Sequence, residues 1–157
     1  MAKQSLSADV LKALTGKRLA TAESLTGGGI GQALTSVSGA SKVYAGGIIS
    51  YTNEVKNRIL GVPAELLNTL GAVSAPVAKA MAEGAKRVLN ADVAVSVTGL
   101  AGPDGDEFGH PVGTVFIGYA DACTAFAREY HFEGDREWVR EQTIQAALEL
   151  ILGKRQT

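Results

Sequence analysis

The sequence predicts an α/β protein, a single-domain α/β/α sandwich in which helices flank a mixed sheet. Three observations lead to this prediction. The chain has 157 residues and 46% of them are hydrophobic, enough for one core without disulfides. Helix-like and strand-like patterns follow one another along the chain. Residues 92–98 (DVAVSVT) form a nearly continuous apolar run, which is typical of a strand covered on both faces.

The N-terminal third predicts a helix, a strand and a second helix. Ser7 is placed to cap a short helix that Gly16 ends. Residues 18–23 predict a strand. Residues 26–37 predict a helix despite their glycines, because four apolar side chains recur at helical spacing.

The middle of the chain predicts a strand and two helices. Residues 43–52 are β-branched and aromatic, which favours a strand. Asn53 is placed to cap a helix that runs to Leu60, where a Gly-Val-Pro sequence stops it. Residues 76–90 carry apolar side chains along one face and charged side chains along the other, which predicts an amphipathic helix.

The C-terminal third predicts three strands and a final helix. The apolar strand at residues 92–98 ends in a glycine-rich loop over residues 99–109. Residues 112–120 and 124–132 predict a hairpin, because only three residues separate them. Asp135 caps a last helix that runs to about Leu152.

Composition excludes several classes of protein. Fifteen Lys and Arg balance 16 Asp and Glu, so the net charge of −1 provides no basic surface for nucleic acid or acidic lipid. One cysteine, Cys123, cannot form an internal disulfide, and with two histidines it makes a poor zinc ligand set. The N-terminus lacks the apolar segment of a secretion signal. We therefore expect a cytoplasmic protein with no membrane partner and no metal.

The glycines gather in two windows but match no common nucleotide motif. Thirteen of the 19 lie in residues 27–47 and 99–118. A dinucleotide fingerprint beginning at Gly27 would need glycine where Gln32 stands, and no P-loop sequence occurs. Of the two histidines that could complete a serine triad, His131 alternates with core positions of a strand and His110 lies in a loop.

Ser24 has two interpretations from the residues alone. It follows a predicted strand and precedes a glycine-rich helix start, where unpaired N–H groups collect. Its hydroxyl either caps the helix, as serine commonly does, or attacks an acyl carbon whose oxyanion the N–H groups near Gly27 and Gly28 hold.

Tyr51 and Lys56 also have two interpretations. They flank Asn53 where a strand meets a helix, and by usual burial they are a strand aromatic and a solvated lysine. A desolvated Lys56 would instead have a lowered pKa and could take the serine proton, with Tyr51 relaying or orienting it.

Two further segments are candidate ligand contacts. Residues 98–105 leave the end of an apolar strand, where α/β sheets place ligands, and their glycines permit close approach to a phosphate or ribose; the alternative is a flexible turn. Arg136 and Arg140 form a phosphate clamp or, as is more common for arginine, face solvent.

Taken together, six blocks of sequence resemble the C-terminal domain of the CinA family (competence/damage-inducible protein), in particular its stand-alone nicotinamide-nucleotide amidases. The resemblance covers about residues 5–152, and we expect residues 1–157 to be a single domain of this type. The blocks are AESLTGG (22–28), GGIISYTNEVK (46–56), GAVS (71–74), SVTGLAGPDG (96–105), PVGT (111–114) and GDR (134–136).

The resemblance implies hydrolysis of nicotinamide mononucleotide to nicotinate mononucleotide and ammonia, without a metal or cofactor. It implies Ser24 as nucleophile and Lys56 as base, with Tyr51 and Thr98 aligning the proton path. Self-association into a homo-oligomer is also implied. The substrate contacts that we expect are Thr26, Gly27, Gly28, Asn53, Gly99, Ala101, Gly102, Arg136 and Arg140.

Two other functions remain open. The chain could be a nucleotide-binding regulatory module without useful turnover, or an amidase for a different ring carboxamide.

Overall fold

A five-stranded mixed sheet forms the centre of the molecule. The computed structural model describes residues 2–156. In spatial order the strands are β2 (Tyr44–Ile49), β1 (Leu19–Glu23), β3 (Val93–Gly99), β4 (Thr114–Ala120) and β5 (Ala125–His131). β1 pairs in parallel with β2 and β3, whereas the β3–β4 and β4–β5 pairs are antiparallel. The mixed sheet and the five predicted strands are confirmed.

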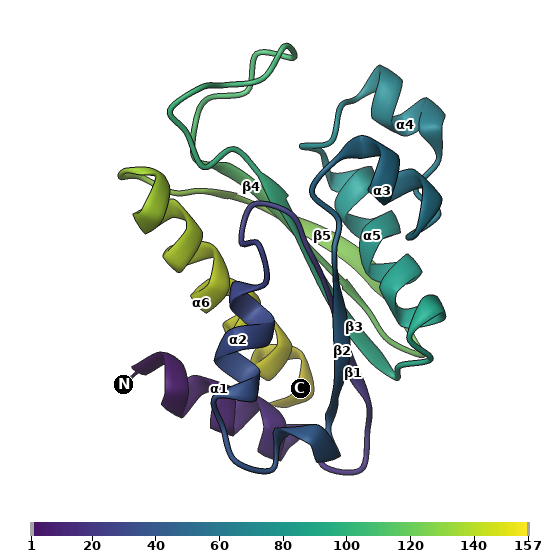
Figure 1. Ribbon diagram of the computed structural model, residues 1–157, viewed down its shortest axis with the longest axis vertical. Helices are drawn as coiled ribbons and strands as arrows, with labels where there is room; N and C mark the ends of the chain where they lie inside the picture. Colours follow the sequence, from purple (N-terminus) through teal and green to yellow (C-terminus); the bar gives the residue numbers. More distant parts are fainter. Residues whose placement is uncertain (1, 157) are drawn as a thin grey trace.

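Helices cover both faces of this sheet. Figure 1 shows α1 (Ala2–Ala13), α2 (Gly29–Thr35) and α6 (Arg136–Gln156) on one side. The other side carries α3 (Asn53–Arg58), α4 (Ala64–Thr69) and α5 (Ala75–Val88). A single 3-10 turn, η1 (Ala40–Lys42), precedes β2. The α/β/α sandwich is therefore confirmed, and no helix within residues 2–156 has the length and apolar character needed to cross a membrane.

Side-chain alternation divides the core into two layers. In β3, Val93, Val95 and Val97 pack in the cluster that includes α1, α2 and α6, whereas Ala94 packs in the cluster under α5. The α5 side carries small residues, so this helix lies close to the sheet. Ser96 on β3 donates a hydrogen bond to the Ala78 carbonyl of α5 at 2.6 Å.

Three predicted helix starts are wrong. α1 begins at Ala2, so Ser7 lies inside the helix with a fully buried side chain and does not cap it. α2 begins at Gly29, because Gly27 and Gly28 have φ values of 58° and 101°, which an α-helix does not allow. The cap of α3 is Thr52, whose hydroxyl accepts the Val55 N–H.

Two further differences concern helix existence and length. The sequence prediction misses α4, since its six residues follow the Pro63 that was interpreted only as a stop. The last helix continues to Gln156, beyond the predicted Leu152. The Asp135 cap is confirmed, because its carboxylate accepts the Trp138 N–H at 2.9 Å.

The parallel strands bring three chain segments to one edge of the sheet. Ser24 follows β1, Ser50 follows β2, and Thr98 lies near the end of β3. The Ser24 N–H donates to the Val97 carbonyl at 3.2 Å, and the Ser50 N–H donates to the Glu23 carbonyl at 2.7 Å. This is the edge at which α/β sheets bind their ligands.

We predict that Gly118→Ala lowers the free energy of unfolding by about 2–3 kcal/mol, because overpacking a close helix–sheet contact has costs of this size. A Cβ at Gly118 would overlap the Ala78 carbonyl oxygen of α5 and the Ser96 hydroxyl. Denaturant unfolding measures the effect. The matched control is Gly153→Ala in α6, where no atom lies within 4 Å of the new methyl group, and it should leave the protein as stable or more stable. Equal stability of the two variants would contradict the prediction.

Candidate active site

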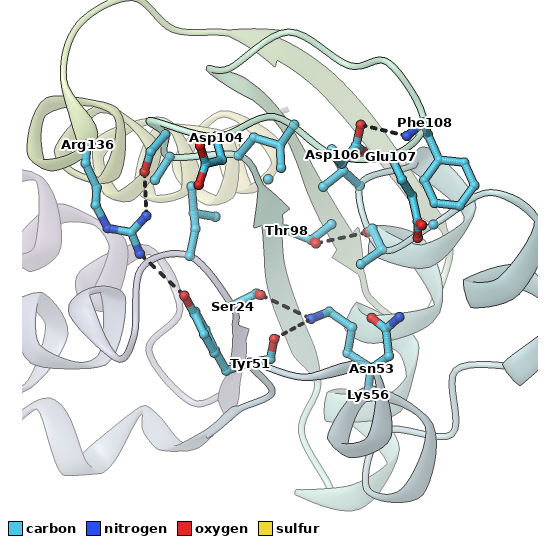
Figure 2. A pocket seen from close by; sticks show the side chains of 18 of the residues that line it. Ser24, Tyr51, Asn53, Lys56, Thr98, Asp104, Asp106, Glu107, Phe108 and Arg136 are labelled. Carbon is cyan, nitrogen blue, oxygen red and sulfur yellow. Dashed lines mark hydrogen bonds between the residues drawn. The ribbon is translucent and has the colours of Figure 1, made fainter.

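A pocket of about 560 Å³ opens at the carboxyl ends of the parallel strands. Figure 2 shows side chains from β-strand ends, α3, α6 and two loops meeting around it. Nine residues that the sequence singles out line it: Ser24, Tyr51, Asn53, Lys56, Thr98, Gly99, Ala101, Gly102 and Arg136.

Ser24 sits at the base of this pocket. It is the first residue after β1, its main-chain N–H is held by Val97, and 7% of the residue is exposed. In β1, Ala20 and Ala22 pack on the α5 side of the sheet, and the same alternation directs Ser24 to that side. The hydroxyl therefore points toward α3, which carries Lys56.

Lys56 is almost fully buried and points at Ser24. It belongs to the six-residue helix α3 and is 1% exposed. Its Nζ lies 3.1 Å from Ser24 Oγ, 2.8 Å from the Ser50 carbonyl oxygen and 3.3 Å from the Tyr51 carbonyl oxygen. Of the two interpretations of Lys56, the structure supports the one in which its side chain is desolvated.

Burial lowers the pKa of Lys56 from 10.5 to about 8. Desolvation disfavours the ammonium, and no ion pair seen among residues 2–156 places a carboxylate on Lys56 to offset that cost. About a tenth of the side chains are thus neutral at pH 7, and about half at pH 8.

The carbonyl groups around Lys56 also orient the neutral amine. An ammonium can donate to all three oxygens that surround Nζ. After losing one proton, the amine can continue to donate to the carbonyls of Ser50 and Tyr51, which directs its lone pair at the Ser24 hydroxyl. This is the geometry in which an amine takes a serine proton.

Tyr51 supplies its main chain, rather than its phenol, to this pair. The residue is 61% exposed, and its hydroxyl lies 3.4 Å from Arg136 Nη2. Figure 2 shows the phenol turned toward Arg136. Arg136, at the start of α6, also donates to the Gly102 carbonyl at 2.6 Å. Arg136 thereby links Tyr51 to the loop after β3, and it presents a positive charge at that end of the pocket.

Thr98 and Asn53 line the same pocket but make no hydrogen bond to Ser24 or Lys56. The Thr98 hydroxyl donates to the Ala72 carbonyl at 2.9 Å, which fixes the segment that forms the opposite wall. Asn53 is exposed at the first turn of α3. The structure therefore brings Thr98 near the pair without a hydrogen bond to either member.

Four predicted substrate contacts do not line the pocket: Thr26, Gly27, Gly28 and Arg140. The Thr26 hydroxyl donates to Glu23, and the Gly27 N–H donates to the Ser24 carbonyl at 3.1 Å. Arg140 donates from Nε to the Leu25 carbonyl at 2.9 Å and from Nη2 to the Thr26 carbonyl at 3.3 Å. These hydrogen bonds hold the loop that follows Ser24 from its side away from the pocket.

Sequence reasoning missed one wall of the pocket. Gly71, Ala72 and Val73 line the pocket, as do Asp106, Glu107 and Phe108. The lining residues Leu100, Pro103 and Asp104 belong to the 98–105 segment that the sequence singles out, and Leu25 follows Ser24 directly. The GAVS block was one of the matching segments, and this was the signal that could have placed residues 71–73 at the site. Gly71 has a φ of 79°, which favours glycine, and a Cβ there would lie 2.5 Å from the Phe108 ring.

His110 does not contact Ser24 but stabilises the 104–110 loop. Its Nδ1 lies 2.7 Å from Asp106 Oδ2, and its main-chain N–H donates to Oδ1. Burial would raise the pKa of Asp106, but the hydrogen bonds from His110 outweigh it and the pKa is lowered. Within the described residues, no three His, Cys, Asp or Glu side chains gather to hold a metal ion.

Comparison with known proteins agrees with this architecture. The family model described as the CinA C-terminal domain matches residues 3–154. A crystal structure of the competence damage-inducible protein A (ComA) from Klebsiella pneumoniae superposes with a TM-score of 0.94 at 35% identity, covering 97% of this chain and 96% of that one.

Two sequence relatives differ in length and in name. The chain is 48% identical to a CinA-like protein of Synechococcus sp. over 94% of its own length, but it spans only 36% of that protein. It is 47% identical to the nicotinamide-nucleotide amidohydrolase PncC of Pseudomonas putida, over 86% of this chain and 84% of that protein. The chain spans about a third of the length of the CinA-like relatives.

We predict that Arg140→Met loosens the loop after Ser24 and lowers the free energy of unfolding by about 1–2 kcal/mol, because two charge-assisted hydrogen bonds to carbonyls are lost. Hydrogen exchange should speed up at residues 25–28 in this variant. The matched control is Arg58→Met, which removes an exposed pairing with Glu54 and should change stability by less than about 0.5 kcal/mol. Unchanged exchange in Arg140→Met would show that the guanidinium does not hold the loop.

Proposed function

Because the chain belongs to the CinA C-terminal domain family, we propose that it hydrolyses nicotinamide mononucleotide to nicotinate mononucleotide and ammonia. The observation that carries the proposal is the contact of 3.1 Å between buried Lys56 and Ser24 in the pocket. The name of the Pseudomonas putida relative supports the choice of substrate. Such a reaction would place the protein in pyridine nucleotide salvage.

The reaction begins when neutral Lys56 takes the proton of Ser24. Ser24 Oγ then forms a bond to the carboxamide carbon, and the carbonyl electron pair moves onto oxygen. The Gly27 N–H already donates to the Ser24 carbonyl, so it is not available to that oxyanion. The N–H groups of Leu25 and Thr26 make no hydrogen bond to a described residue, and we assign the oxyanion to them. Leu25 lines the pocket, whereas the buried Thr26, whose side chain is bound to Glu23, contributes its main-chain N–H alone.

The acyl enzyme forms and breaks by proton transfer through Lys56. The lysine ammonium gives its proton to the amide nitrogen as the carbon–nitrogen bond breaks, and ammonia leaves. A water molecule then gives a proton to Lys56 and attacks the ester carbon. The bond between Ser24 Oγ and that carbon breaks as Lys56 returns the proton to Oγ, which releases the carboxylic acid and restores both side chains. No metal or cofactor takes part in this scheme.

The rest of the nucleotide lies along the loop after β3. Glycines at positions 99 and 102 let the main chain approach a ribose, and Arg136 supplies a donor for phosphate at the same end. Asn53 lies at the mouth beside Lys56, where its amide can meet the substrate carboxamide. Tyr51 acts through its carbonyl and through its contact with Arg136.

We predict that Ser24→Ala lowers ammonia release from nicotinamide mononucleotide by about 10³-fold or more, because the variant lacks the nucleophile. Calorimetric titration should show that the nucleotide still binds. Ser41→Ala, at an exposed serine, is the control and should keep full activity. Near-normal turnover by Ser24→Ala would overturn the assignment.

Two other outcomes of the same assay identify the alternative functions. Binding of the nucleotide without ammonia over hours, even by the unmodified protein, would indicate a regulatory module. Faster release from nicotinamide or another ring carboxamide would indicate a different amidase, and glutamine serves as the unrelated amide.

We predict that kcat/KM rises about tenfold per pH unit below pH 8 and levels off above it, because only the neutral Lys56 accepts the serine proton. The sign follows from the need for a deprotonated amine, whose fraction rises with pH up to the pKa. Burial lowers the pKa of Lys56 to about 8 and so sets the pH at which the profile levels off. Lys56→Arg should be inactive at every pH from 6 to 10, since guanidinium stays charged. A flat profile for the unmodified protein across pH 8 would contradict Lys56 as the base.

A further inference from the structure

Glu23, the residue before the nucleophile, is a buried carboxylate that the reaction scheme does not use. It is 2% exposed, and no ion pair seen among residues 2–156 includes it. Instead it accepts three hydrogen bonds. Oε1 accepts from the Thr26 hydroxyl at 2.6 Å and from the Ile30 N–H at 2.9 Å, and Oε2 accepts from the Gly31 N–H at 3.0 Å. A buried carboxylate is costly unless such bonds satisfy it, so they fix its place.

The carboxylate lies beneath the loop that carries the proposed oxyanion donors. Glu23 ends β1 with its side chain on the α2 side of the sheet, whereas Ser24 points to the α3 side. The three hydrogen bonds join Thr26, on one side of the Gly27–Gly28 turn, to Ile30 and Gly31 on the other. One side chain thus closes the loop across the turn.

Arg140 holds the same loop from α6. Its guanidinium binds the carbonyl oxygens of Leu25 and Thr26. In a trans peptide the N–H points opposite to the carbonyl of the preceding residue, so fixing the Leu25 carbonyl on Arg140 turns the Thr26 N–H away from α6. Arg140 therefore sets the direction of this peptide group, while Glu23 holds the Thr26 side chain next to it.

We infer that Glu23 is a positioning residue for the proposed hydrolysis. It holds residues 25–28 so that the N–H groups of Leu25 and Thr26 meet the oxyanion while Ser24 stays in contact with Lys56. The inference rests on the proposed serine–lysine reaction. Since loss of one well-placed oxyanion donor lowers kcat by about 10²–10³-fold, misplacing both should have an effect of at least the lower size.

The main test is Glu23→Gln, measured as kcat and KM for nicotinamide mononucleotide. The variant keeps the shape of the side chain, but its NH₂ group must face a donor at either Gly31 or the Thr26–Ile30 pair. We expect kcat to fall about 100-fold with KM within about threefold of the original. Glu23→Asp keeps both oxygens and should recover part of the lost kcat. A kcat within about threefold of the original in Glu23→Gln would overturn the inference.

The control separates positioning from general destabilisation. Ser96→Ala also removes a buried hydrogen bond, from β3 to α5, without touching the loop after Ser24. We expect it to lower the melting temperature with kcat close to the original. Equal losses of kcat in Ser96→Ala and Glu23→Gln at equal melting temperatures would overturn the inference. If Glu23→Gln does not fold, Thr26→Val decides: kcat should fall about tenfold, and an unchanged kcat would overturn it.

A second readout does not depend on the substrate. A fluorophosphonate forms an Oγ–phosphorus bond with Ser24 as fluoride leaves, Lys56 takes the proton, and the phosphoryl oxygen occupies the oxyanion site. Glu23→Gln should slow this labelling about as much as it lowers kcat, and equal labelling rates would overturn the inference. If the unmodified protein released no ammonia, the proposed function would fail while the labelling rates would still decide the role of Glu23.

Discussion

The burial of Lys56 against Ser24 is the constraint on which the rest of the site depends. A lysine that is 1% exposed must either lose its proton or find oxygen acceptors, and this one has both options. Desolvation lowers its pKa, and two main-chain carbonyls keep its remaining protons occupied. Without the carbonyls the lone pair could face any direction. Without burial the amine would be protonated at neutral pH and could not act as a base.

The sheet and its helices supply this environment through main-chain contacts. β1 and β2 run in parallel, so Ser24 and Ser50 leave the sheet side by side, and the Ser50 N–H donates to the Glu23 carbonyl. The Thr52 cap begins α3 directly afterwards and turns Lys56 back toward Ser24. On the opposite side, Glu23 and Arg140 hold the loop after Ser24. The Ser24–Lys56 contact is thus fixed mainly by backbone groups, whereas the charged side chains of Asp104, Asp106, Glu107 and Arg136 line other parts of the pocket.

The fold could be predicted more completely than the site. A strand such as residues 92–98 is recognised from its apolar run, which reflects burial. A helix start depends on a single cap such as Thr52, and a neighbouring polar residue can look like the cap. Ser24 and Lys56 are 32 positions apart, and the residues alone left each with a structural alternative. Arg140 has the right charge for a phosphate, yet its partners are carbonyls of Leu25 and Thr26, and residue type cannot distinguish these ligands. Phe108 lines the pocket because its ring packs against Gly71, and this contact between distant segments is not evident from the sequence.

The most direct test of this account is the titration of the Lys56 side chain in the intact protein by NMR with labelled lysine. Lys56→Arg identifies its signal by removing it. The account predicts a midpoint near pH 8, well below those of the exposed lysines. A midpoint at the usual value of 10.5 would show that Lys56 stays charged where the protein works, and it would contradict a mechanism in which this amine takes the Ser24 proton.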